Sequence, residues 1–132
     1  MVKLVTAAIM MKGDRVLIAK RKAGVTSMGG WEFPGGKIEE GESPEACLAR
    51  EMQEELGILV EVGSFFGESV YDYNDGTIEL RAYWTRWISG DMRLNVHDEV
   101  RWVKLDMLQG VDFLPADVPL AEKLAAVGLS EY

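Results

Sequence analysis

Three glutamates, Glu51, Glu54 and Glu55, stand three and four residues apart in the segment 44–56. If this segment is helical, at about 100° per residue the three carboxylates lie within a turn of each other. Like charges at this spacing repel, and the C-terminal end of a helix disfavours negative charge. A multivalent cation relieves the repulsion, and carboxylate oxygens suit Mg²⁺ or Mn²⁺. The alternative is a solvated acidic face in which Arg50 pairs with Glu54.

The sequence marks both ends of the helix that would carry these glutamates. Ser43 suits the N-cap, Pro44 suits the first helical position, and Gly57 suits a left-handed C-terminal cap. Apolar residues recur along the helix at steps of three and four and form a narrow stripe that can pack on a sheet: Leu48, Ala49, Met52 and Leu56.

The residues around this helix have a longer pattern. From Gly36 the chain passes through Glu42 and continues as Arg50-Glu51-Met52-Gln53-Glu54-Glu55-Leu56-Gly57-Ile58. The stretch resembles the Nudix box, G-x5-E-x7-R-E-U-x-E-E-x-G-U with U aliphatic, at every defined position. The chain is therefore identified as resembling the Nudix hydrolases, which implies an α/β fold of the α/β/α sandwich type, with a mixed β-sheet between helices.

Looser likeness extends beyond the box. The segments WEFPGGK (31–37) and LPAD (114–117) look like those of the MutT and CTP pyrophosphohydrolase branch. Enzymes of this branch cut a nucleoside triphosphate to the monophosphate and pyrophosphate, with Mg²⁺ (or Mn²⁺) and an attacking water. The resemblance thus implies a nucleoside triphosphate substrate.

The same resemblance assigns roles at the phosphate end of that substrate. Glu51, Glu54 and Glu55 are expected to ligate metal together with the Gly35 carbonyl, and one of the glutamates to orient or deprotonate the water. Three further residues have supporting roles: Arg50 holds the carboxylates, Lys37 faces the phosphates, and Glu42 braces the loop against the helix.

At the nucleoside end the resemblance points to Arg21, Phe33 and Asp117. Arg21 is expected beside the phosphates or the base, because a planar guanidinium can also stack. Phe33 is a stacking candidate whose alternative is a core residue. Asp117 is a base-reading candidate whose alternative is the N-cap of a C-terminal helix.

Two departures from the branch bear on the substrate. Relatives often carry an acidic residue in an E-H-x-E loop, but Val96 stands first in Val96-His97-Asp98-Glu99, so a catalytic carboxylate would have to be Glu99 or Asp98. Gly76 stands about where oxidised-guanine-specific relatives have a base-contacting Arg. Both favour a cytidine-type triphosphate (CTP, dCTP or 5-methyl-dCTP) over 8-oxo-dGTP. His97 itself is expected to be a loop residue or to support a ligand, rather than to bind metal.

Other substrates and a different class of function stay open. The box recognises pyrophosphate and metal only, so ADP-ribose, NADH and diadenosine polyphosphates remain possible. Some Nudix domains bind nucleotides as sensors without hydrolysis, but they typically lose box carboxylates, and this chain retains every one. Hydrolysis is therefore favoured.

Composition sets further bounds. A chain of 132 residues is long enough for one domain with a sizeable core, and we expect a single domain over residues 1–132. The net charge of −8 argues against a nucleic-acid partner, and the longest apolar runs fall short of the roughly 18 residues that span a bilayer. The single Cys47 excludes an internal disulfide and indicates a reducing cytoplasm; a small buried residue is expected there. A monomer is expected.

Hydrophobic periodicity predicts the remaining elements. Residues 3–11 form an apolar run typical of a strand buried on both faces, and 15–21 a second strand in a hairpin with it. The other expected elements are a loop at 22–30, strands at 59–62, 64–73, 77–87 and 100–104, a hairpin turn at 74–76, a polar loop at 96–99, a helical turn at 106–109 and a helix at 118–127.

Overall fold

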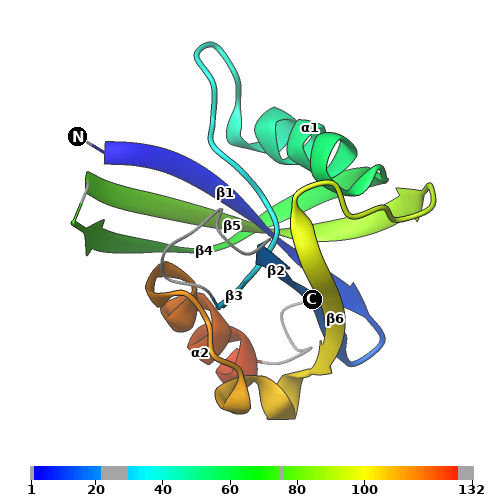
Figure 1. Cartoon of the computed structure of the whole chain (residues 1–132), viewed down its shortest axis with the longest axis vertical. Coiled ribbons are helices and arrows are strands. Elements are labelled where there is room, and N and C mark those ends of the chain that lie inside the picture. The colour runs from blue at the N-terminus through cyan, green and yellow to red at the C-terminus, as the bar shows by residue number, and fades with distance from the viewer. Residues whose placement is uncertain (1, 22–29, 75, 128–132) are drawn as a thin grey trace.

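A computed structural model of the chain describes residues 2–21, 30–74 and 76–127, and in them a mixed sheet lies between helices (Figure 1). The strands are β1 (Val2–Lys12), β2 (Arg15–Arg21), β3 (Trp31–Glu32), β4 (Leu59–Tyr73), β5 (Gly76–Ser89) and β6 (His97–Lys104). The helices are α1 (Pro44–Leu56) and α2 (Val118–Val127), with 3-10 segments η1 (Leu105–Gly110) and η2 (Pro115–Asp117).

Strand β1 is central to the sheet. It pairs in parallel with β5 from Val2 to Met10, and β4 pairs antiparallel with the far side of β5. On its other side β1 pairs with β2 only at Met11 and Lys12, next to the predicted hairpin turn. Strand β2 then diverges to pair with β3 and with β6. The N-terminal part of β1, residues 2–10, is therefore open on that side for pairing with another segment.

The chain after β3 takes that place. Three backbone hydrogen bonds join it to β1: Ala8 N–H donates to the Pro34 carbonyl, Thr6 N–H to the Gly36 carbonyl, and Ile38 N–H to the Leu4 carbonyl. Loop 33–38 thus runs along β1 as an extended segment, although it contains a proline and two glycines.

Two hydrophobic clusters lie on opposite faces of the sheet. One packs beneath α1 and includes Ala8, Met10, Leu17, Leu48, Met52, Leu56 and Tyr83; the other packs beneath α2, η1 and η2 and includes Ala7, Ile9, Ile18, Leu80, Leu120 and Leu124. Successive residues of β1 alternate between the clusters, as strand geometry requires. The prediction of a strand buried on both faces at 3–11 is confirmed for residues 6–11, whereas Lys3 and Leu4 are exposed. The α/β/α sandwich with a mixed sheet is confirmed.

Strand β4 differs from the prediction of two strands at 59–62 and 64–73. It is one strand, and its pairing with β5 shifts register between Val62 and Phe65 and again between Phe65 and Gly67. Bulges of this kind let a strand bend without ending. Gly63 therefore marks an irregularity, not a turn.

The predicted polar loop at 96–99 is wrong for three of its four residues. His97, Asp98 and Glu99 belong to β6, where His97 pairs with Arg21 and Glu99 with Lys20 of β2. Pairing with a central strand overrides the weak strand propensity of polar residues. In addition, Tyr83 and Thr85 of β5 are buried, and Tyr83 belongs to the cluster beneath α1.

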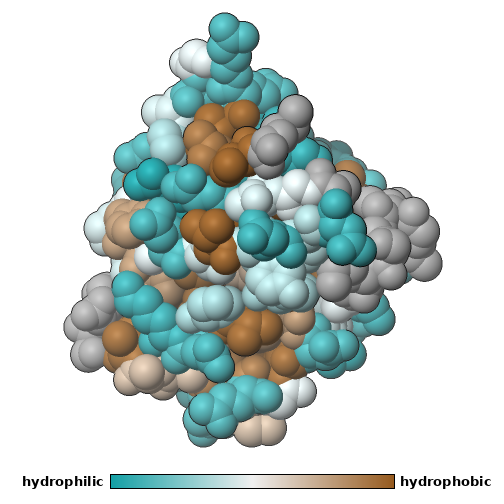
Figure 2. Space-filling view, turned by 90° about the vertical axis from the view of Figure 1, so that its left-hand side faces the viewer, coloured by the Kyte–Doolittle hydropathy of each residue, from teal (hydrophilic) through white to brown (hydrophobic). Residues whose placement is uncertain are grey.

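The surface has no long apolar face on the side shown in Figure 2, where hydrophobic residues emerge as separate patches among hydrophilic ones. Among the described residues, no helix is long and apolar enough to cross a membrane. Most of the predicted loop at 22–30, and Asp75 of the predicted turn, lie outside the described residues.

The packing of α1 on the sheet yields a stability prediction. Met52 is fully buried in the α1 cluster, and its removal leaves a cavity. We expect Met52→Ala to lower the free energy of unfolding by about 2–5 kcal/mol in urea denaturation. The neighbouring Gln53 is exposed, so Gln53→Ala should change it by less than about 0.5 kcal/mol. Equal effects of the two changes would contradict this packing.

Candidate functional site

The glycines of loop 33–38 allow a close approach that no other residue permits. A Cβ on Gly35 would lie 1.9 Å from the Thr6 carbonyl oxygen of β1, and a Cβ on Gly36 would lie 2.2 Å from Cδ of Glu51 on α1. The Thr6 hydroxyl also donates to the Gly36 carbonyl, at 3.1 Å. The loop is therefore held between β1 and the acidic part of α1.

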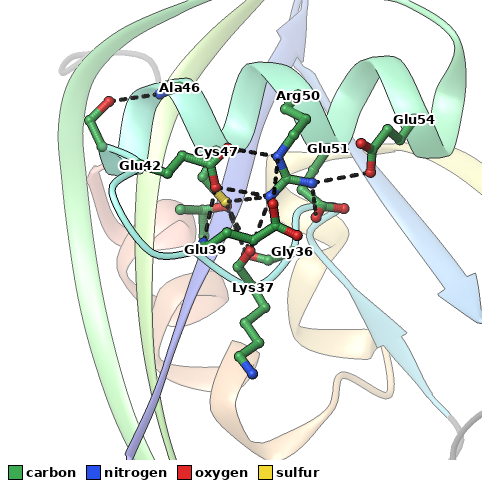
Figure 3. A network of polar contacts seen from close by, with 11 residues as sticks. Gly36, Lys37, Glu39, Glu42, Ala46, Cys47, Arg50, Glu51 and Glu54 are labelled. Atoms are coloured by element: carbon green, nitrogen blue, oxygen red, sulfur yellow. Dashed lines mark hydrogen bonds and ion pairs between the residues drawn. The ribbon is translucent and has the colours of Figure 1, made fainter.

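Arg50 is the centre of the polar network on this side (Figure 3). Its Nε and Nη2 donate to the two carboxylate oxygens of Glu42 at 2.7 and 2.9 Å. Its Nη1 donates to Glu51 at 2.9 Å and to Glu54 at 3.1 Å. Nη2 also reaches the Lys37 carbonyl, at 3.3 Å. One guanidinium thus joins three carboxylates and the glycine loop.

The electrostatics follow from this geometry. The hydrogen bonds from Arg50, and the one from the Glu39 N–H, lower the pKa of the Glu42 carboxyl to about 2 from its ordinary 4.5. The bond to Glu42 in turn raises the pKa of the Arg50 guanidinium above its usual value. Glu42 braces the loop against the helix, as predicted.

Cys47 lies beneath the same network. Its Sγ is 3.4 Å from the Lys37 carbonyl oxygen, and burial raises the pKa of the thiol. A thiol held protonated is a poor nucleophile. The prediction of a small buried residue is confirmed.

The three glutamates predicted to ligate metal do not face the same way. The side chains of Glu51 and Glu55 are 12 % and 11 % exposed, whereas Glu54 is 59 % exposed. Glu51 and Glu54 turn to Arg50, and Glu55 approaches His97. Within residues 2–21, 30–74 and 76–127, no group of three His, Cys, Asp or Glu side chains is arranged to hold a metal ion.

The donor set nevertheless fits a hard cation. Every candidate ligand is an oxygen, the type that Mg²⁺ and Mn²⁺ prefer. Oxygens of Glu51 and Glu54 already approach a single Arg50 nitrogen, which shows that both carboxylates can reach one positive centre.

A buried histidine lies behind this acidic helix. The His97 side chain is 0 % exposed, and its Nε2 is 3.1 Å from an oxygen of Glu32 and 3.9 Å from an oxygen of Glu55. Glu32 was not singled out in the sequence, since it stands between Trp31 and Phe33 with no periodic or metal-ligand spacing to mark it. His97 was expected in a loop, and its burial follows from its place in β6.

A small pocket of about 90 Å³ opens on the other side of loop 33–38. Its lining comes from five distant segments of the chain and includes Thr6, Glu32, Phe33, Gly35, Tyr73 and Asp117. Asp117 is 5 % exposed, and its carboxylate accepts a hydrogen bond from the Phe33 N–H at 2.9 Å. Two residues that the sequence assigned to the base therefore meet here, and Tyr73 was missed.

The pocket gives both residues a structural role as well. The Phe33 ring is buried and stacks on Phe113 with the centroids 5.1 Å apart, so much of the ring belongs to the core. Asp117 directly precedes α2, in the position predicted for an N-cap. Its bond to Phe33 joins the start of the glycine loop to the turn before α2.

The side chains of two predicted residues are not brought into this network, and the side chain of a third is not described. Glu99 lies on β6, not in a loop, and pairs with Arg101 at 2.7 Å. Lys37 is exposed, and its side chain extends away from the Arg50 contacts (Figure 3). The side chain of Arg21 lies outside the described part of the chain.

Comparisons with known proteins agree with the sequence motif and with the fold. The profile of the NUDIX domain matches residues 2–125. The chain is 39 % identical over 118 residues to a putative 8-oxo-dGTP diphosphatase 2 of Mycobacterium tuberculosis, covering 87 % of this chain and 82 % of that protein. It is 33 % identical over 123 residues to the CTP pyrophosphohydrolase of Escherichia coli, covering 93 % and 91 %. The solution structure of the E. coli ORF135 protein superposes with a TM-score of 0.82 at 32 % identity, over 96 % of this chain and 90 % of the other.

The pKa of Glu42 yields a prediction in acid. A carboxyl with a lowered pKa stabilises the fold above its unfolded value near 4.5, and this contribution is lost as the pH falls towards 2. Glu42→Gln lacks it. Urea denaturation should therefore show the largest difference between wild type and Glu42→Gln near pH 6, and a shrinking difference from pH 4.5 to 2.

The control for this experiment is Gln53→Ala, which removes no titratable group and lies on α1, the helix that Glu42 contacts through Arg50. Its difference from wild type should stay constant across the same pH range. A constant difference for Glu42→Gln as well would contradict the role assigned to the two hydrogen bonds from Arg50 to Glu42.

Proposed function

The chain belongs to the Nudix family and is a Nudix pyrophosphohydrolase, and from this premise we propose that it hydrolyses a cytidine-type nucleoside triphosphate to the monophosphate and pyrophosphate. The observation that carries the proposal is the position of loop 33–38. Gly36 borders the acidic helix on one side, and Gly35 lines the pocket on the other. A nucleotide that spans the loop has its phosphates at the carboxylates and its base in the pocket.

At the phosphate end we assign Glu51, Glu54 and Glu55 to hold Mg²⁺ or Mn²⁺. When bound, such a cation neutralises phosphate charge and lowers the pKa of a bound water. One of these carboxylates accepts the proton of the attacking water. Arg50 fixes Glu51 and Glu54 through hydrogen bonds from its Nη1, and the exposed Lys37 ammonium attracts the phosphates.

The Gly35 carbonyl is assigned to the same cation. In an extended segment, successive carbonyls point to opposite sides. The Pro34 and Gly36 carbonyls accept hydrogen bonds from β1, so the carbonyl between them is expected to face away from β1.

At the base end the pocket favours a base with an amino group. An ionised Asp117 only accepts hydrogen bonds, which matches the exocyclic N4 amino group of cytosine. The likeness to the E. coli CTP pyrophosphohydrolase supports the same choice.

A second candidate substrate is 8-oxo-dGTP. It is favoured by the likeness to the M. tuberculosis protein, which has the higher identity of the two relatives. Gly76 speaks against it, because a residue without a side chain cannot supply the side-chain hydrogen bonds of an Arg to an oxidised guanine. Assays with CTP, dCTP, 5-methyl-dCTP and 8-oxo-dGTP, in which ³¹P NMR identifies pyrophosphate, would distinguish the two.

The metal assignment is tested at Glu54. Glu54→Gln keeps the shape and removes one negative charge, so we expect kcat to fall at least a hundredfold with the fold intact by circular dichroism. Glu40→Gln removes the same charge from an exposed site outside the Arg50 network and should leave kcat within about twofold. Retention of more than about a tenth of wild-type kcat in Glu54→Gln would show that the assignment is wrong.

The base assignment is tested at Asp117. Asn keeps the oxygen that accepts from the Phe33 N–H and adds a donor. Asp117→Asn should lower kcat/KM for dCTP or 5-methyl-dCTP at least tenfold relative to 8-oxo-dGTP, about 1.4 kcal/mol of discrimination.

The matched control is Asp112→Asn, the same change at a nearby exposed position. It should leave the ratio between substrates unchanged. Equal losses on all triphosphates in Asp117→Asn would limit Asp117 to a structural role.

A further inference from the structure

His97 lies between the two ends of the proposed site. Its Nε2 is 3.1 Å from Glu32, which lines the pocket, and 3.9 Å from Glu55, which is assigned to the metal. These two carboxylates come from β3 and from the last turn of α1. Among the described residues, His97 is thus the side chain whose Nε2 lies within 3.9 Å of both carboxylates.

The direction of the hydrogen bond follows from the chemistry of the partners. An ionised carboxylate accepts and cannot donate, so the proton between His97 and Glu32 lies on Nε2. The nearest Glu55 oxygen lies 3.9 Å from the same Nε2, too far for a hydrogen bond, so only a longer-range attraction joins the two groups. Because the ring is fully buried, this attraction is weakly screened by solvent.

The other ring nitrogen has a different environment. In the part of the chain that the structure describes, Nδ1 has no hydrogen-bond partner. The polar contribution of His97 to these residues therefore passes through Nε2 alone.

We propose that His97 is a positioning residue that holds Glu32 against the pocket through the Nε2–H hydrogen bond and favours the metal-binding orientation of Glu55 through the electrostatic attraction of the same group. Groups that orient metal ligands in this way typically contribute 10–100-fold to metal affinity or activity. The inference rests on the proposed function, since it takes Glu55 as a metal ligand.

Two substitutions separate Nε2 from the rest of the ring. The amide nitrogen of Gln reaches about as far from the backbone as Nε2, whereas that of Asn reaches only about as far as Nδ1. His97→Gln can therefore keep a donor to Glu32, and His97→Asn cannot. Lys104→Gln, at an exposed position at the end of the same strand, is the control.

The first measurement is Mn²⁺ affinity by electron paramagnetic resonance, with no nucleotide present. We expect His97→Asn to raise the dissociation constant about tenfold, and His97→Gln and Lys104→Gln to stay within about threefold of wild type. The second measurement is kcat and KM on the triphosphate that is hydrolysed best. We expect His97→Asn to lower kcat at least tenfold and His97→Gln to retain most of the wild-type kcat.

The outcomes are distinguishable. Thermal denaturation reports stability, and a lower Tm of His97→Asn with unchanged Mn²⁺ affinity would make His97 only a structural residue. Equal impairment of the Gln and Asn variants, both folded, would overturn the role of Nε2. A wild-type protein that binds Mn²⁺ but hydrolyses no triphosphate would contradict the proposed function, while the comparison of Mn²⁺ affinities would still test His97.

Discussion

The hydrogen-bonded fork between Arg50 and Glu42 is the interaction on which the site depends. Loop and helix in this region both carry glutamates, and without a cation between them they would repel. Arg50 binds Glu42 through two parallel hydrogen bonds, the strongest geometry available to a guanidinium and a carboxylate. The remaining donors reach Glu51 and Glu54, so the position of the loop and the orientation of these two carboxylates, which we propose hold the metal, rest on the same side chain.

The second constraint is steric. Loop 33–38 can lie along β1 and still touch α1 only because two consecutive residues have no side chain. Thr6 fixes the loop through its backbone N–H and its hydroxyl, and β1 is itself fixed by parallel pairing with β5. The position of the loop is therefore set by the centre of the sheet.

Local signals were sufficient for the elements that carry the family motif. Helix α1 begins and ends where Ser43 and Gly57 place its caps, with the Ser43 hydroxyl accepting from the Ala46 N–H and Gly57 at a φ of 70°. The bounds of β2 and α2 also agree with the prediction. In each case the periodicity lies within the element, and the capping residues of α1 directly flank it.

Features that depend on tertiary pairing could not be predicted in the same way. The polar residues 97–99 form a strand because β2 supplies a partner. The buried His97 is hydrogen-bonded to Glu32, which is 65 residues away in sequence. The pocket draws Tyr73 and Asp117 from segments far apart in the sequence, and Tyr73 is held there by accepting a hydrogen bond from the Ala116 N–H. No short window of sequence contains either pair.

The adjacent glycines of loop 33–38 also have an evolutionary consequence. Gly36 borders the proposed phosphate surface and Gly35 lines the pocket, so the two proposed halves of recognition are one peptide unit apart. Tyr73 accepts from the Ala116 N–H and Asp117 from the Phe33 N–H, whereas the hydrogen bonds of Arg50 go to other residues. Selection can therefore retarget the base while the hydrolytic half is inherited unchanged, in keeping with relatives whose names specify different nucleotides.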